Sequence, residues 1–216
     1  MRLISVNIGQ ARPLQNAKEG GKTGIYKEPV DGPVTITRNG LDSDVICEIE
    51  NHGGLDQAIY MYGTPDYAWW SQKLQRELPP GTFGENLTIT DLESASALIG
   101  DRFLIGSAVL EVSAPRIPCL TLARRMEDDS FVKQFLAAER PGLYCRVLQE
   151  GRLQTGDTVT YARYTGETVS AIEMMRDFYS PNLSEAAIRR FLAAPIAIRA
   201  RIHKEDQLRA RLVKEP

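Results

Sequence analysis

Hydrophobic and polar positions alternate with a period of two over most of the first three quarters of the chain, a pattern typical of strands with one buried face. The runs that follow it predict strands at 1–9, 33–37, 45–50, 108–112, 143–148 and 157–161. Turn signals such as Asn39-Gly40 separate these short runs. Many short strands with few helices indicate a mainly β fold, either a barrel or a sandwich.

Two helices interrupt this pattern. Thr64-Pro65-Asp66 has a capping hydroxyl, a proline in the first turn and an early acidic residue, which together predict a helix start. Tyr67, Trp70, Leu74 and Leu78 follow at helical spacing and predict a stripe packed on the core. A second short helix is predicted over 128–138.

The hydrophobic period changes to that of helices after Gly166. Pro181 and Pro195 divide the rest of the chain into three predicted helices. We therefore predict two domains, a β domain over 1–166 and a small three-helix domain over 167–216. From 168 onward there are nine Lys and Arg against six Asp and Glu, so the tail is mildly basic.

Composition argues against a nucleic-acid-binding, membrane-spanning or disulfide-rich protein. The chain has 216 residues, is 43% hydrophobic and 25% charged, and carries a formal charge of −2, which gives no reason to expect a nucleic acid partner. No apolar run approaches the roughly 18 residues of a membrane span, and the N-terminus is too short and strand-like for a signal peptide. Three cysteines without paired spacing argue against disulfides and predict a cytoplasmic location.

Cys119 is the first candidate for chemistry. It follows the strand over 108–112 through a segment in which Pro115 and Pro118 stop regular structure, so we expect it on a stiff loop. The neighbouring guanidinium of Arg116 could lower the pKa of its thiol. Cys47 and Cys145 instead share strand faces with apolar residues and are predicted to be buried.

A histidine and a lysine lie in glycine-rich segments. His52 is followed by Gly53 and Gly54, which allow a ligand to approach the backbone or the chain to adopt positive φ. Metal-ligand spacing is absent, and the other histidine, His203, is expected on a solvated helix face. The loop Gly20-Gly21-Lys22-Thr23-Gly24 suits either an anion site or an ordinary surface loop.

Several short segments follow one another along the chain in a particular order and spacing. They are Lys22-Thr23-Gly24-Ile25-Tyr26-Lys27, Gly40-Leu41 with Asp44, His52-Gly53-Gly54, Phe83-Gly84-Glu85-Asn86-Leu87, Gly100-Asp101 and Pro115-Arg116-Ile117-Pro118-Cys119. Together they resemble the MOSC domain, a β-barrel domain of molybdenum-cofactor sulfurases and of stand-alone proteins. The tail resembles the three-helix (3-alpha) domain of the bacterial subgroup that confers resistance to N-hydroxylated purines. At 43–48 the sequence departs from the family pattern, and no ligand role is assigned there.

This resemblance implies a molybdenum–pterin cofactor, with Cys119 as the metal ligand. It also implies an oxidoreductase that reduces N-hydroxylated bases with electrons from a reductase or a ferredoxin-like partner. Lys22, Lys27 and Arg116 are then candidates to neutralise the cofactor phosphate, and His52 to deliver a proton. The further cofactor-binding residues expected are Thr23, Gly53, Gly54 and Asn86.

Other functions stay open at this point. Cys119 could carry a persulfide as a sulfur donor, although this sequence holds no desulfurase domain to load it. Cys119 and His52 could form a nucleophile–base pair for acyl transfer, for which the sequence reveals no orienting partner. The chain could also be a non-catalytic cofactor-binding module. The three helices could serve partner docking, homodimerisation or stability alone.

Overall fold

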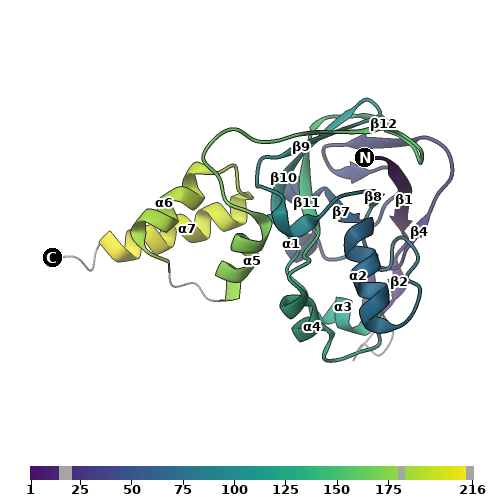
Figure 1. Ribbon diagram of the computed structural model, residues 1–216, viewed down its shortest axis with the longest axis horizontal. Coiled ribbons are helices and arrows are strands. Elements are labelled where there is room, and N and C mark those ends of the chain that lie inside the picture. Colours follow the sequence, from purple (N-terminus) through teal and green to yellow (C-terminus); the bar gives the residue numbers. More distant parts are fainter. Residues whose placement is uncertain (15–20, 180–182, 213–216) are drawn as a thin grey trace.

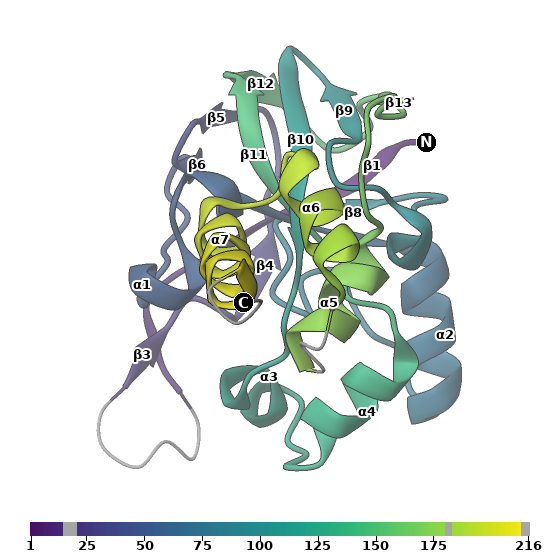
Figure 2. The same cartoon turned by 90° about the vertical axis from the view of Figure 1, so that its left-hand side faces the viewer.

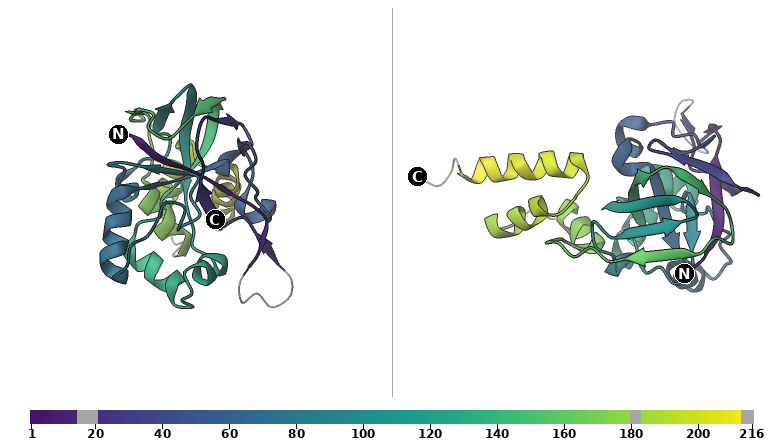
Figure 3. Two further views of the ribbon diagram at one scale, coloured as in Figure 1. Left: turned by 90° about the vertical axis from the view of Figure 1, so that its right-hand side faces the viewer. Right: turned by 90° about the horizontal axis from the view of Figure 1, so that it is seen from above.

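The computed structural model describes residues 1–14, 21–179 and 183–212. A sheet-dominated body forms most of the molecule, and three C-terminal helices extend from one side of it (Figures 1 and 3). Figure 2 faces the side on which helices α1, α3, α5 and α7 lie, and the candidate site described below opens among some of these elements. The predicted combination of a sheet with a few helices and a helical tail is confirmed.

The main sheet contains eight strands. In spatial order they are β13 (Val159–Ala162), β9 (Arg102–Ile105), β10 (Ala108–Pro115), β11 (Leu143–Gln149), β7 (Ile59–Gly63), β8 (Leu87–Ile89), β1 (Leu3–Gly9) and β4 (Lys27–Pro29). Neighbouring strands are antiparallel except β7 and β8, which are parallel. That parallel pair requires a crossover, which α2 (Thr64–Leu74) supplies.

The predicted closed barrel is not found among the described residues. The start of β1 lies beside the start of β13, the strand at the far end of the sheet, but an isolated bridge between Arg2 and Thr158 joins them instead of a continuous ladder. Beside that bridge, the amide of Leu3 donates to the carbonyl of Asp157 at 3.0 Å. The strand pattern in the sequence therefore predicts the sheet, whereas the approach of β1 to β13 involves residues more than 150 positions apart.

Shorter strands and helices complete the body. The small pairings are β12 (Gly151–Leu153) with β5 (Val34–Thr37), β5 with β6 (Gly40–Leu41), and β2 (Arg12–Pro13) with β3 (Lys22–Thr23). The short helices are α1 (Ile49–His52), η1 (Leu55–Gln57), η2 (Ser94–Ser96), α3 (Leu120–Arg125) and α4 (Phe131–Ala138). No helix in the described ranges has the length and apolar character needed to cross a membrane.

Helices α2 and α4 cover one side of the body through an aromatic cluster. Trp70 and Tyr67 are buried as predicted, and the Trp70 ring lies 5.9 Å from that of Phe135. The Trp70 indole also donates to the hydroxyl of Tyr62 at 2.8 Å. Two details of the prediction are wrong: α2 ends at Leu74, and Thr64 makes no side-chain cap because the cap position belongs to Gly63.

The predicted strand over 45–50 is also wrong. Residues 44–48 have no regular structure and lead into α1, so Cys47 is exposed where the alternating pattern predicted burial. The physical reason is Asp44, whose carboxylate accepts from Lys27 and from the amide of Gly9. These contacts draw the chain toward the end of β1 and away from a ladder. Cys145, by contrast, is buried as predicted.

The tail forms three helices as predicted: α5 (Ala171–Tyr179), α6 (Glu185–Ala193) and α7 (Ile198–Leu212). Pro195 lies between α6 and α7, whereas Pro181 falls outside the described residues. His203 is exposed on α7, as expected. Phe191 belongs to the same hydrophobic core as the sheet, so the tail packs on the body rather than standing alone.

A buried ion pair ties two of the tail helices together. Lys204 of α7 is 2% exposed, and its Nζ lies 2.5 Å from Oδ2 of Asp177 on α5. The same ammonium lies 5.0 Å from the centre of the Phe191 ring on α6. All three helices thus meet at one lysine.

Candidate functional site

A cavity of about 270 Å³ opens between the end of the sheet and the segments that carry the predicted site residues. Seven of the nine predicted residues line it: Lys22, Thr23, Lys27, His52, Asn86, Arg116 and Cys119. Gly53 and Gly54 do not line it. Segments separated by almost a hundred positions therefore converge on one site.

Cys119 stands at the junction of β10 and α3. β10 runs three residues further than predicted and ends at Pro115; the chain then stays irregular up to Cys119, whose φ of −130° and ψ of 172° are extended. The Cys119 carbonyl accepts from the amides of Leu122 and Ala123, which starts α3 at the next residue. The expected loop position is confirmed, and α3 was not predicted.

The environment of Cys119 favours its thiolate. Burial raises the pKa of this thiol, but a hydrogen bond from His52, the positive charge of Arg116 and a bond from the Leu122 amide outweigh that effect and lower it to about 6. A thiolate is therefore the main form at neutral pH. In contrast, burial raises the pKa of Cys145 above its ordinary value.

Arg116 forms the buried wall of the cavity behind Cys119. It is 5% exposed, its Nη1 donates to the carbonyl of Phe83 at 2.6 Å, and its guanidinium lies 5.0 Å from the centre of the Tyr60 ring. Among the described residues, its buried Nε has no hydrogen-bond partner. A buried cation with an unused donor at a cavity wall is suited to an anionic ligand.

Lys27, Asp44 and Asn86 form a buried polar network. Both carboxylate oxygens of Asp44 lie within 2.6 Å of the Lys27 ammonium, and Oδ2 also accepts from the Asn86 amide at 2.8 Å. The Asn86 side-chain oxygen accepts from the backbone of Tyr60 at 3.1 Å. Burial lowers the pKa of Lys27, and the negative charge and hydrogen bonds of Asp44 oppose that shift. Asp44 therefore balances the positive charge of Lys27, and the hydrogen bonds to Asp44 and Tyr60 hold the Asn86 side chain in place.

The glycine-rich segment reaches the cavity through Gly21, Lys22, Thr23 and Gly24, while Gly20 lies outside the described residues. Lys22 is exposed, and the Thr23 hydroxyl accepts from the amide of Ile25 at 3.1 Å. A Cβ on Gly24 would lie 1.8 Å from the carbonyl oxygen of Val45. This glycine therefore allows two backbone segments of the cavity wall to touch.

His52 is the last residue of α1 and is half-buried. It contacts the Cys119 sulfur, and its Nε2 lies 3.5 Å from Oε2 of Glu48, one helical turn earlier. Gly53 ends α1, and Gly54 has φ of +97°, a left-handed conformation that favours glycine. The two glycines thus turn the chain after His52 rather than line the cavity.

Sequence reasoning missed several residues of the site. Asp44, Cys47, Tyr60 and Tyr144 line the cavity. The pKa of Tyr179, the last residue of α5, is raised by burial and by the charge of Cys119, although Tyr179 does not line the cavity. The tyrosines look like ordinary core positions in a strand pattern, and only the match of Asp44 to the family pattern gave a signal.

Comparison with known proteins identifies the family. The MOSC domain matches residues 48–160. The chain is 32% identical over 191 residues to the uncharacterized protein YflK of Bacillus subtilis (strain 168), covering 88% of this chain and 86% of YflK. It is 31% identical over 192 residues to a protein named reductase in Gibberella moniliformis (strain M3125 / FGSC 7600), covering 84% of this chain but 33% of that protein. The crystal structure of YiiM from Geobacillus stearothermophilus matches with a TM-score of 0.78 at 25% identity, covering 96% and 98% of the two chains.

Proposed function

Because the chain belongs to the MOSC domain family, we propose that it binds a molybdenum–pterin cofactor in its cavity and reduces N-hydroxylated compounds, with Cys119 as the protein ligand of the metal. The observation that carries this proposal is the Cys119 thiol, whose pKa is lowered to about 6 at the wall of the cavity. The relative named as a reductase supports redox chemistry.

The donor set fits such a cofactor. In the described part of the chain, no group of three His, Cys, Asp or Glu side chains is arranged to hold a metal ion by itself. A single soft thiolate suits a metal whose other ligands arrive with the cofactor, as with a pterin dithiolene. Cys119 supplies that one sulfur.

The cavity also offers positive charge for the cofactor phosphate. Arg116 has an unused buried Nε, and Lys22 is exposed at the rim. Lys27 is bound to Asp44 at 2.5 Å, so its charge is already balanced. We therefore assign phosphate binding to Arg116 and Lys22, and a supporting role to Lys27 and Asn86.

The proposed reaction converts R–NH–OH, two electrons and two protons into R–NH₂ and water. The bound cofactor supplies the two-electron chemistry, with electrons from a reductase or ferredoxin-like partner. His52 contacts Cys119 and is 31% exposed, so it can deliver a proton to the leaving oxygen and recover one from solvent. Arg116 holds positive charge beside the thiolate throughout.

The activity test is reduction of 6-hydroxylaminopurine by cofactor-loaded protein with an artificial electron donor. The proposal expects turnover by wild type, loss of turnover in Cys119→Ser, and at least a tenfold loss in His52→Ala from the general-acid contribution of 10²–10⁴ that is only partly replaced by water. Cofactor bound at full occupancy without reduction of any N-hydroxylated compound would instead indicate a non-catalytic binding module.

One observation favours a second function. Glu48 lies 3.5 Å from His52, which contacts Cys119, so the orienting partner that the sequence did not reveal for a Cys–His pair is present. Such a triad supports acyl transfer through a thioester on Cys119. An activated ester separates the two: a thioester on Cys119 that forms with release of the alcohol and is then hydrolysed, with repeated turnover, would favour acyl transfer. Cyanide-releasable sulfur without molybdenum would indicate a persulfide carrier.

A further inference from the structure

Helix α1, which carries His52, is too short to be stable by its own hydrogen bonds. It has four residues, and its backbone is closed by two bonds, from His52 to Glu48 at 2.9 Å and from Gly53 to Ile49 at 3.1 Å. Its N-cap residue makes no side-chain bond to the helix. Because one helical turn costs more entropy than its bonds return, α1 requires contacts from outside.

Those contacts come from Arg199 on α7, about 150 positions away. Nη2 of Arg199 donates to the carbonyls of Ile49 and Gly53, each at 3.2 Å, and Nη1 lies 3.4 Å from the side-chain oxygen of Gln57. The two carbonyls stand at the beginning and at the end of α1. A single guanidinium thus spans the helix. It gives a second donor to the Ile49 carbonyl, which also accepts from the Gly53 amide, and a donor to the carbonyl of Gly53, the residue that ends the helix.

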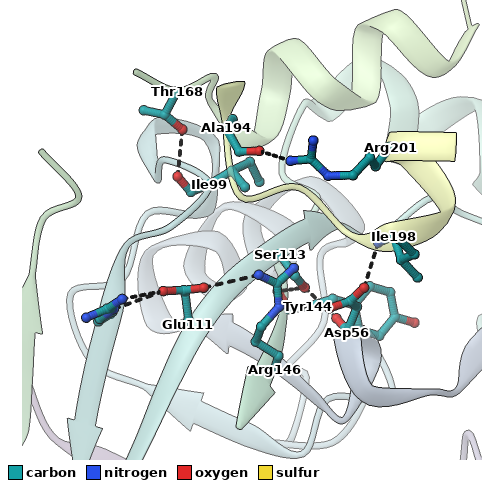
Figure 4. A network of polar contacts seen from close by, with 11 residues as sticks. Asp56, Ile99, Glu111, Ser113, Tyr144, Arg146, Thr168, Ala194, Ile198 and Arg201 are labelled. Atoms are coloured by element: carbon teal, nitrogen blue, oxygen red, sulfur yellow. Dashed lines mark hydrogen bonds and ion pairs between the residues drawn. The ribbon is translucent and has the colours of Figure 1, made fainter. Parts of the chain in front are cut away.

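The start of α7 is itself anchored to the sheet (Figure 4). The amide of Ile198 donates to Oδ2 of Asp56 at 2.6 Å, and Oδ1 of Asp56 accepts from Arg146 of β11 at 2.8 Å. Arg146 also bonds Glu111 of β10 at 3.1 Å. In addition, the amide of Ala197 donates to the carbonyl of Ser113 on β10 at 3.0 Å. The position of Arg199 is therefore fixed relative to β10, the strand that leads to Cys119.

We propose that Arg199 is a positioning residue that holds α1 so that His52 stays against Cys119, and that the tail is in this way part of the active-site scaffold. This inference rests on the proposed role of His52 as the proton donor. It assigns α7, the last of the three helices, a task in the site beyond stability. Arg199 itself does not line the cavity and acts through α1.

The test uses metal-free protein in a Cys47→Ser background, so that Cys119 is the accessible thiol. Hydrogen exchange of the His52 and Gly53 amides reports on α1, and the pH midpoint of Cys119 alkylation by iodoacetamide reports on the His52 contact. In Arg199→Ala we expect exchange at least tenfold faster and a midpoint about one pH unit higher. Adding Arg199→Ala to His52→Ala should leave the midpoint where His52→Ala alone puts it.

Two further variants separate positioning from general loosening of the tail. Arg199→Lys keeps the positive charge but cannot donate from two nitrogens at once. It should therefore change the exchange rate and the alkylation midpoint less than Arg199→Ala does. Arg201 is a matched control on the same helix, because its guanidinium donates to the carbonyls of Leu192 and Ala194 and not to α1. Unchanged exchange and midpoint in Arg199→Ala, or equal effects in Arg201→Ala, would overturn the proposal. Since neither readout needs the cofactor, failure of the reductase function leaves this test intact.

Discussion

The pH dependence of Cys119 alkylation tests the electrostatics of the site. Burial raises the pKa of this thiol, yet His52, Arg116 and the Leu122 amide together lower it to about 6. A thiol with that pKa is about 10% ionised at pH 5 and about 90% ionised at pH 7, whereas one with a pKa of 9 is about 1% ionised at pH 7. The rate constant with iodoacetamide should therefore rise about tenfold between pH 5 and pH 7 and then level off.

The shape of this profile is more informative than its height. A thiolate of lower pKa is less nucleophilic, and with a Brønsted coefficient of about 0.4–0.5 the plateau rate falls roughly 20-fold below that of an ordinary thiolate. The pH midpoint of the alkylation profile does not depend on this loss of nucleophilicity. In His52→Ala, which keeps Arg116 but loses the strongest stabilising contact, the midpoint should move up by at least about one pH unit.

The assay uses metal-free Cys47→Ser protein and quantifies the modified Cys119 peptide by mass spectrometry. Cys145 is an internal control, because it is fully buried and should stay unmodified in folded protein. A midpoint near 9 would refute the claim that the site stabilises the thiolate. A midpoint of 6 that is unaffected by His52→Ala would show that His52 has no part in it.

Further predictions concern packing. Lys204→Met leaves Asp177 buried without its partner and should cost about 3–5 kcal/mol of stability in a denaturant melt, while pairing it with Asp177→Leu should recover most of that loss; no recovery would mean that the charge pair is not the cause. Gly24→Ala places a Cβ 1.8 Å from the Val45 carbonyl oxygen, so it should cost about 1–3 kcal/mol and weaken cofactor binding, and a wild-type melting temperature would contradict the close approach.

Local sequence signals were sufficient for the centre of the site. The prolines around Arg116 and Cys119 stop the strand, and the chain does leave the sheet there with the thiol at the cavity. Cys47 shows where the same reasoning fails. The alternating apolar and polar residues around Cys47 resemble a strand. The ion pair between Lys27 and Asp44, however, joins segments 17 positions apart, and an alternating pattern carries no information about such a contact.

The contacts that complete the site are more distant still. Tyr60 and Tyr144 lie side by side on β7 and β11, with ring centres 5.1 Å apart, because strands 84 positions apart in the sequence are neighbours in the sheet. Arg199 reaches α1 across about 150 positions. The spacing of hydrophobic residues along the sequence does not predict such contacts, which can be identified only from the folded structure. The same holds for β1 and β13, whose starts are joined by one isolated bridge between Arg2 and Thr158.

Whether Cys119 binds the metal is tested by the molybdenum content of protein expressed in a host that makes the cofactor, compared between wild type and Cys119→Ser. A matched variant, Cys47→Ser, removes the other cysteine that lines the cavity. We expect one molybdenum per chain in wild type and in Cys47→Ser, and loss of most of it in Cys119→Ser. Equal molybdenum in all three proteins, or none in wild type, would contradict this expectation.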